Sequence, residues 1–344
     1  AILTDGVKVA YFSFVGDVVR HTSLHNISVD DIDRIIKAIL NNHTKKFEPS
    51  NIVKDFAISS NSTSPSRTIA TILYNQLSSD CITEKSSMLY SEWKELMHLS
   101  VDDDGQSNDI EPRRKDLSLI FNCTISNPET EYKALFALQT TYAIIVKLIA
   151  CKVVDKLNFN SETHDYHALS TLTSTKTQKF FQNMEDGYSY TSMGIRNFLE
   201  GDFFSWYADS NQWSDEFWQN IKNIITEVDS YSSFSLNVTY SPVDVFKDLY
   251  MSIIPQSIRH SMGEYFTPEW LADCVITEAL SSIKKEDWIA IDPCCGSGIF
   301  IIALIKKVVG DISINELSES EKKTILDSII TRVHGIDINP LSVL

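Results

Sequence analysis

The chain has 344 residues, 43% of them hydrophobic, which is enough for two or three domains and a large core. Its 30 basic and 46 acidic residues give a formal net charge of −16, so the chain as a whole is a poor non-specific binder of nucleic acid, and any DNA contact must be local or lie elsewhere. The six cysteines form no C-x-x-C pair and no metal-ligand spacing with the eight histidines, and no targeting signal is visible, which indicates a cytoplasmic protein without a metal site.

The first 42 residues predict a hairpin followed by a helix. Residues 7–19 (VKVAYFSFVGDVV) have the β-branched and aromatic composition of strands around a Gly-Asp turn. Residues 28–42 place isoleucines and a leucine at helical spacing behind Ser28, with Asp31 three residues later as a partner for an N-terminal cap.

Residues 20–260 are predicted to be mostly helical, with further helices at 66–78, 84–98, 129–155, 194–208, 214–228 and 242–254. The apolar stretch 132–154 is interrupted by polar residues and falls short of the roughly 18 uninterrupted apolar residues of a membrane span, so we expect a buried helix. The aromatic run 198–218 is typical of core packing rather than of base stacking. The PRRK run at 112–115 is typical of a solvated loop.

The pattern changes after Pro255. Residues 287–293 (DWIAIDP) predict a short strand, 294–309 a tight turn that enters an apolar helix, and 331–340 a second strand that ends in Asp337. This order is the opening of a doubly wound parallel sheet, in which ligands bind beyond the carboxyl ends of the strands. Asp292, Gly296, Gly298 and Asp337 fall at these ends.

Two features narrow the class of ligand. The turn is preceded by an acid, Asp292, and lacks the third glycine of G-x-G-x-x-G, so a dinucleotide is less favoured than a ligand with a cationic amino acid end. Asp337, at the end of the next strand, suits the two hydroxyls of a ribose. A nucleoside that carries a positively charged amino acid is S-adenosylmethionine.

Three segments resemble motifs X, I and II of the amino-methylating DNA methyltransferases, with motif X ahead of motif I: 262–276 (MGEYFTPEWLADCVI), 290–304 (AIDPCCGSGIFIIAL) and 333–344 (VHGIDINPLSVL). The long helical lead-in resembles the large fused restriction-modification enzymes of type IIG and related phage-defence methylases. The resemblance implies a Rossmann-like fold, S-adenosylmethionine as cofactor and double-stranded DNA as partner.

The resemblance also implies the residues that hold the cofactor. Thr267 and its neighbours would close over the methionine end, Asp292 would face the amino group, and Asp337 would bind the ribose hydroxyls. The full implied set is Tyr265, Phe266, Thr267, Pro268, Asp292, Cys295, Gly296, Ser297, Gly298, Phe300, Asp337 and Ile338.

Several of these positions have other readings. Asp292 could be only a cap of its strand end, and Phe300 could be only helix-to-sheet packing. Cys294 is typical of a small buried side chain rather than of a nucleophile. His260 and His334 are interpreted as ordinary surface or strand residues.

Catalysis in the family needs an (N/D/S)-P-P-(Y/F) turn that holds the amino nitrogen of a flipped base. No two of the nine prolines are adjacent, so we assign no catalytic residue. The sequence therefore predicts the cofactor-binding part of a DNA (adenine-N6) methyltransferase of a restriction-modification or phage-defence system, inactive by itself. Two alternatives stay open, namely a non-catalytic interaction module of a defence complex and a methyltransferase that acts on protein, RNA or a small molecule.

We expect three regions. Residues 1–20 would be a hairpin that resembles the end of an upstream nuclease module, 21–255 a helical domain, and 256–344 an incomplete methyltransferase domain with only the first two strands of its sheet. The bare outer edge of the second strand would allow two copies to pair.

Overall fold

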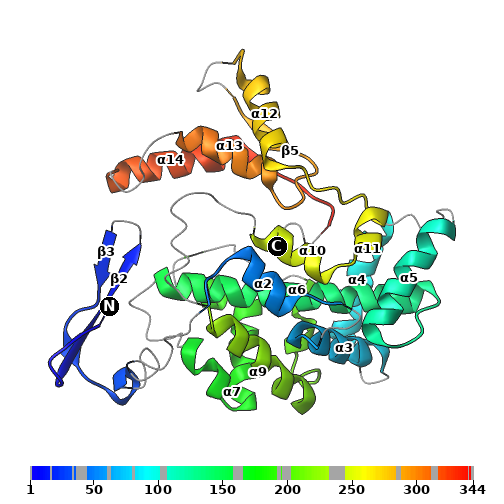
Figure 1. The fold of residues 1–344 in the computed structure, drawn as a ribbon, viewed down its shortest axis with the longest axis horizontal. Helices are drawn as coiled ribbons and strands as arrows, with labels where there is room; N and C mark the ends of the chain where they lie inside the picture. The colour runs from blue at the N-terminus through cyan, green and yellow to red at the C-terminus, as the bar shows by residue number, and fades with distance from the viewer. Residues whose placement is uncertain are drawn as a thin grey trace.

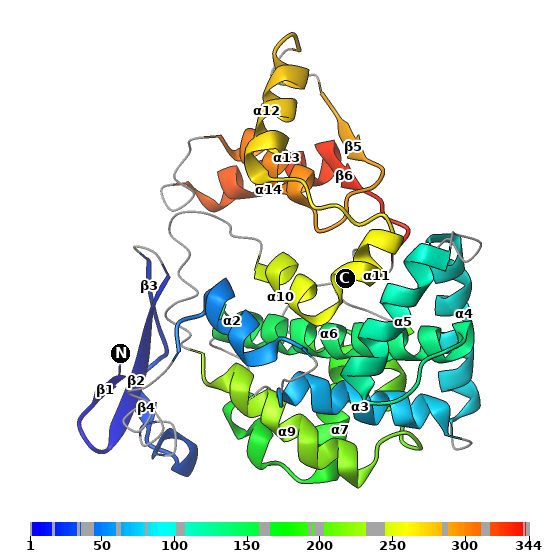
Figure 2. The ribbon, with the colours of Figure 1, turned by 45° about the vertical axis from the view of Figure 1, so that its right-hand side comes forward.

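The computed structural model describes residues 2–15, 18–32, 35, 45–59, 63–79, 82–100, 107–157, 166–191, 195, 203–231, 245–283, 288–310, 317–339 and 341. Figures 1 and 2 show a small N-terminal sheet, a large group of helices, and a second α/β group formed by the described residues from α12 onward. The chain is mostly helical, as predicted.

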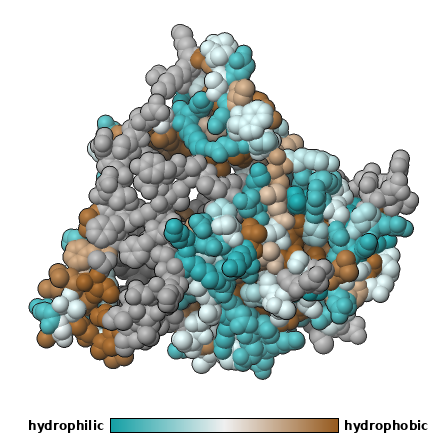
Figure 3. All heavy atoms as spheres, in the orientation of Figure 1, coloured by the Kyte–Doolittle hydropathy of each residue, from teal (hydrophilic) through white to brown (hydrophobic). Residues whose placement is uncertain are grey.

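The N-terminal sheet is built around one long strand. Strand β2 (Lys8–Val15) pairs antiparallel with β1 (Ile2–Thr4), β3 (Val18–His21) and β4 (His25–Asn26). The β2–β3 pair confirms the predicted hairpin, although its Gly-Asp turn lies outside the described residues. Hydrophobic residues gather in the region of this sheet in the space-filling view (Figure 3). Leu3, Val7 and Val19 of this N-terminal segment are exposed.

The predicted cap at Ser28 is present and connects the following helical turn to the sheet. The backbone N–H and the hydroxyl of Ser28 donate to Asp31 Oδ2 at 2.9 and 2.7 Å, and the N–H of Asp31 donates back to Ser28 Oγ at 3.2 Å. The Tyr11 hydroxyl of β2 donates to Asp31 Oδ1 at 2.6 Å. Residues 29–32 and 35 are helical, and the rest of the predicted 28–42 helix lies outside the described residues.

The large group of helices from α2 to α11, called the helical domain below, confirms the predicted helices at 66–78, 84–98, 129–155 and 214–228 and, in its described residues, the helix at 242–254. It contains α2 (Pro49–Phe56), α3 (Pro65–Ser78), α4 (Glu84–Ser100), α5 (Ser107–Phe121), α6 (Pro128–Leu157), α7 (Ser174–Glu185), α8 (Tyr188–Thr191), α9 (Asp215–Asp229), α10 (Val245–Ile253) and α11 (Gln256–Ser261), with 3-10 turns η1 (Tyr166–Thr171) and η2 (Phe203–Ala208). Of the predicted 194–208 helix, residues 203–208 form η2, residue 195 is not helical, and the remainder lies outside the described residues.

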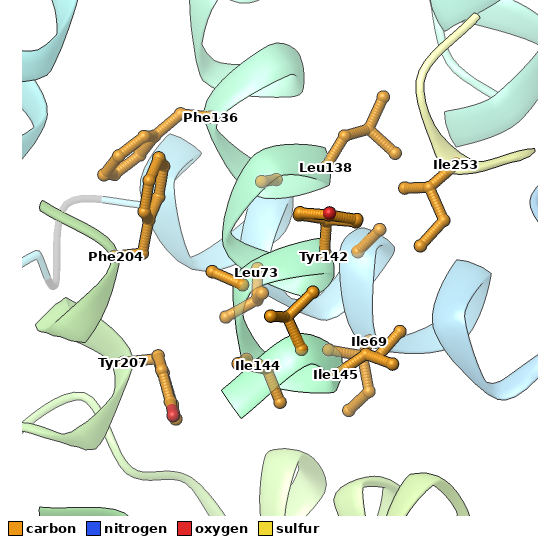
Figure 4. Packing of buried hydrophobic residues seen from close by; sticks show 14 of the residues in the cluster. Ile69, Leu73, Phe136, Leu138, Tyr142, Ile144, Ile145, Phe204, Tyr207 and Ile253 are labelled. Carbon is orange, nitrogen blue, oxygen red and sulfur yellow. The ribbon is translucent and has the colours of Figure 1, made fainter. Parts of the chain in front are cut away.

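Helix α6 is the centre of the core. Figure 4 shows its side chains Phe136, Leu138 and Tyr142 among residues from α3, η2 and α10. Among the described helices, the Pro128–Val153 part of α6 is long and apolar enough to cross a membrane by length and composition, yet 94% of its apolar window is buried inside the fold. The prediction of a buried core helix is confirmed.

The polar residues that interrupt α6 are bonded to neighbouring helices. Trp93 Nε1 of α4 donates to Gln139 Oε1 at 2.8 Å, and Trp206 Nε1 of η2 donates to the Thr140 hydroxyl at 3.0 Å. The ammonium of Lys147, fully buried, donates to Glu185 Oε2 at 2.5 Å. Buried polar groups are tolerated where such partners exist, so these residues fix how α6 is rotated in the core.

The structure tests the interpretations of the aromatic run 198–218 and of the PRRK run 112–115. The core reading of the aromatic run is confirmed, since Phe204, Trp206 and Tyr207 are almost completely buried. The solvated-loop reading of PRRK is wrong: residues 112–115 lie inside α5, and Arg113 is 3% exposed with Nε 2.8 Å from Glu131 Oε1. An acid on the adjacent helix α6 offsets the cost of burying the guanidinium.

The last group of elements contains α12 (Glu269–Leu280), β5 (Ala290–Asp292), α13 (Ile299–Val309), α14 (Glu319–Arg332) and β6 (Val333–Gly335). Strands β5 and β6 are parallel, with Asp292 opposite Gly335. The predicted strand–turn–helix–helix–strand order is confirmed, although β6 ends at Gly335 rather than at Asp337. The doubly wound arrangement stays a prediction, because the described part of this sheet has two strands.

A small second core holds this group together. It consists of the buried side chains Ile276, Trp288, Ala303 and Leu304, with Phe300 and Val333 partly buried against them. Ile289 and Ile291 of the β5 segment, which are 71% and 59% exposed, alternate with Trp288 and Ala290 and leave the other face of the strand open to solvent.

Candidate functional site

The site predicted from the sequence lies where β5 and β6 end. The turn after β5 passes through Gly296 and Gly298, whose φ angles of 51° and 82° are left-handed, a conformation that glycine adopts at little cost. The Gly298 N–H donates to the carbonyl of Cys295 at 2.8 Å, and Gly298 is the N-cap of α13. Apart from the residues on either side of it, no heavy atom of the described residues lies within 4 Å of the position that a Cβ of Gly296 would take, so the backbone there is open to a ligand.

The loop after β6 is hydrogen bonded to this turn. The Ile336 N–H donates to the Asp292 carbonyl at 2.9 Å, and the Cys295 N–H donates to the Ile336 carbonyl at 3.0 Å. Gly335 allows this close approach, because a Cβ there would lie 3.1 Å from Cys295 Sγ and 3.2 Å from Cys295 Cβ. The two strand ends therefore form one continuous backbone surface.

Asp337 is fixed against the glycine turn. Its Oδ2 accepts the Gly296 N–H at 2.8 Å, and its Oδ1 accepts the Asn339 N–H at 2.8 Å. The neighbouring Ile338 is 54% exposed. The acid predicted to bind a ribose is thus held beside the turn that the sequence placed 41 residues earlier.

The two carboxylate oxygens of Asp292 have different surroundings. Its Oδ1 accepts the Cys294 N–H at 3.1 Å, as the strand-end cap reading expects. Its Oδ2 is buried and has no hydrogen-bond partner among the described residues. A buried carboxylate oxygen without a donor is costly, and the position therefore suits a donor from a ligand.

The adjacent cysteines differ. Cys295 is half-buried, and burial together with the nearby carboxylates Asp337 and Asp292 raises the pKa of its thiol. This keeps the thiol protonated, which is unfavourable for a nucleophile. Cys294 is exposed, so the prediction that it is a small buried side chain is wrong; its backbone N–H donates to Asp292 Oδ1.

The segment before α12 (residues 263–268) begins with a tight turn. Gly263 has φ 71° and its N–H donates to the His260 carbonyl at 3.0 Å, while the Glu264 N–H donates to the Arg259 carbonyl at 2.9 Å, which closes α11. The chain then runs extended to Pro268, the N-cap of α12. This geometry carries residues 264–267 from the helical domain toward the α/β group.

The predicted residues of this segment have different surroundings. Phe266 packs against the helical core, with its ring centroid 6.1 Å from that of Tyr250 and the Lys247 ammonium 5.3 Å from it. Tyr265 is 72% exposed and stacks on His260 at 5.0 Å. Thr267 is half-buried and Pro268 is exposed, and among the described residues no hydrogen bond joins either one to the glycine turn.

Phe300 and Ser297 complete the predicted set. Phe300 lies in the first turn of α13 and is partly buried against the small second core, which supports its packing role. Ser297 is half-buried in the glycine turn. The structure thus brings together the predicted residues of the two strand ends. The segment that contains residues 265–268 is hydrogen bonded to the loop after β6 through the residue before them, Glu264.

That residue, Glu264, was missed by the sequence reasoning, as were its partners. The Tyr250 hydroxyl of α10 donates to Glu264 Oε2 at 2.8 Å, and Asn339 Nδ2 donates to Glu264 Oε1 at 2.7 Å. Burial raises the pKa of Glu264. A lone acid between Gly263 and two aromatic residues was a weak local signal, and nothing in the sequence pattern pairs it with a residue 75 positions away.

No group of three or more His, Cys, Asp or Glu side chains in the described part of the chain is arranged to hold a metal ion. No curated protein and no solved structure matches the chain. Residues 242–341 match the family model described as N-6 DNA Methylase, a segment that starts just before α10 and contains the whole site. The resemblance to the amino-methylating DNA methyltransferases is therefore confirmed for this segment: residues 242–341 are similar to the N-6 DNA methylases.

Proposed function

We propose that residues 242–341 bind S-adenosylmethionine and that this site serves adenine-N6 methylation of double-stranded DNA. The observation that carries the proposal is the buried Oδ2 of Asp292, which no group of the described residues hydrogen bonds, beside two left-handed glycines and Asp337 at the ends of parallel strands. Its position suits a cationic amino group, and the open backbone at Gly296 suits close approach of the ligand.

Different residues of the chain would bind different parts of the cofactor. Asp292 would take the amino group through Oδ2 while its Oδ1 keeps the Cys294 N–H. Asp337 has lone pairs left on both oxygens after accepting two backbone N–H groups, and these would take the ribose hydroxyls. When bound, S-adenosylmethionine supplies the methyl group on a positively charged sulfonium, whose charge suits a site with two carboxylates.

Methyl transfer needs more than this site. The sequence contains no two adjacent prolines and hence no (N/D/S)-P-P-(Y/F) turn to hold the target amino group. We propose that these 344 residues bind cofactor but do not methylate DNA by themselves, and that the working enzyme belongs to a restriction-modification or phage-defence system. The missing turn also favours a second candidate, a non-catalytic module of a defence complex that keeps a cofactor site.

Calorimetric titration of the chain with S-adenosylmethionine tests the proposal. We expect binding that Asp292→Asn weakens by about tenfold or more, because the variant replaces a charged acceptor with a neutral one. Glu278→Ala, an exposed change on α12, should bind like the wild type. Absence of binding by the wild type would refute the cofactor proposal, and methyl transfer to duplex DNA by this chain would refute the proposed inactivity.

A further inference from the structure

A continuous row of hydrogen bonds runs from the helical domain to the glycine turn. It starts at the Tyr250 hydroxyl of α10, passes through the Glu264 carboxylate to Asn339 Nδ2, and continues from the Asn339 N–H to Asp337 Oδ1. Asp337 Oδ2 then accepts the Gly296 N–H at 2.8 Å. The row crosses four segments of the chain that are distant in sequence.

Two members of the row, Tyr250 and Asn339, are anchored in the helical domain. Tyr250 is 7% exposed and belongs to the large helical core. Asn339 is 6% exposed, and its Oδ1 accepts the N–H of Leu341, whose side chain lies in the same core. The loop after β6 is therefore bonded to the glycine turn at its start and held by the helical domain at Asn339 and Leu341.

Glu264 joins Tyr250 and Asn339 directly, and its surroundings explain why it stays there. Tyr250 faces it from α10, Arg259 from α11, and Asn339 and Asp337 from the loop after β6. Burial raises the pKa of Glu264, while the hydrogen bonds of Tyr250 and Asn339 favour the ionised form. A glutamine can accept the same bond from Asn339, whereas an alanine leaves two buried donors without an acceptor.

We propose that Glu264 is a positioning residue: through Asn339 it holds Asp337 against Gly296, and through Tyr250 it couples this arrangement to the helical domain. The consequence for the cofactor rests on the proposed function, because it needs Asp337 to be a ligand of S-adenosylmethionine. The positioning itself does not depend on that ligand.

Amide hydrogen exchange of the full chain without ligand tests the positioning. Glu264→Ala should speed exchange in peptides that cover 294–298 and 336–341 by about tenfold, which corresponds to about 1.4 kcal/mol of lost local stability. Glu264→Gln should exchange like the wild type, and so should the control Glu278→Ala. Wild-type exchange in Glu264→Ala would overturn the inference.

Tyr250→Phe keeps the test valid if Glu264→Ala does not fold, because it removes only the hydroxyl. We expect faster exchange of 336–341 by about threefold, and unchanged exchange in this variant would also overturn the coupling to the helical domain. Titration with S-adenosylmethionine then separates the two proposals. If the wild type binds, Glu264→Ala should weaken binding about tenfold and Glu264→Gln should restore it; if the wild type does not bind, the proposed function fails while the exchange result still decides the positioning.

Discussion

Substitution of Gly335 by alanine should separate the two strand ends that form the candidate site. The added Cβ would lie 3.1 Å from Cys295 Sγ and 3.2 Å from both Cys295 Cβ and Ile301 Cδ1. Carbon atoms pack best at about 3.5 to 4.0 Å, so the new contacts are at least roughly 0.3 Å too short. The Ile301 methyl can move, but Cys295 is held by its N–H bond to the Ile336 carbonyl at 3.0 Å.

The cost of this overpacking should be about 1 to 3 kcal/mol of unfolding free energy. Urea denaturation followed by circular dichroism measures it, and titration with S-adenosylmethionine should show weaker binding, because the turn must shift away from β6. His334→Ala, an exposed change on the same strand, should leave both values close to those of the wild type.

A double-mutant cycle identifies the cause. Cys295→Gly removes the two closest atoms, so Gly335→Ala should cost less in its presence, with a coupling energy of about 1 kcal/mol or more. The reasoning is refuted if Gly335→Ala is as stable as the wild type, or if its cost is unchanged when Cys295 is glycine.

Two further predictions concern stability outside the site. Burial opposes ionisation of Asp31, but hydrogen bonds from Tyr11 and Ser28 outweigh it and hold the pKa of Asp31 well below its usual range. The ionised carboxylate therefore stabilises the fold above the unfolded pKa of about 3.9. This stabilisation is lost as the pH falls toward the folded pKa. Asp31→Asn should therefore lower stability by about 1 to 3 kcal/mol at pH 7, with the difference from wild type shrinking below about pH 4 in thermal melts; a difference that is constant with pH would contradict this. Lys147→Met should lower the unfolding free energy by about 3 to 5 kcal/mol, because it leaves the buried Glu185 without its cation. Adding Glu185→Leu should recover most of that loss in urea denaturation. No recovery would show that the remaining contacts of Glu185, such as the Tyr207 hydroxyl at 2.6 Å, dominate.

Local sequence signals predicted the helices well, because the interactions that start a helix lie within a few residues. Ser64 and Ser214 cap α3 and α9 by accepting the N–H of the residue three positions on, at 3.3 and 3.1 Å. The strand–turn–helix order and the two glycines of the turn were readable for the same reason, since only glycine adopts those φ angles readily.

Interpretations failed where the deciding partner is distant in the sequence. The run at 112–115 has the composition of a loop, but Glu131 on the next helix makes a buried arginine acceptable in α5. Cys294 and Cys295 are identical neighbours, and only the packing of the turn on Gly335 buries one of them and exposes the other.

For this protein, the sequence by itself determined the order of its elements and the chemical types at the candidate site, because helix caps, glycine turns and strand ends are encoded over a few residues. Only the tertiary structure decided that Asp337 is held against Gly296, that Asp292 keeps one buried oxygen without a partner in the described residues, and that Glu264 connects both strand ends to the helical domain. Those contacts join residues 41 and 75 positions apart, and they form only when the packed cores bring the segments into register.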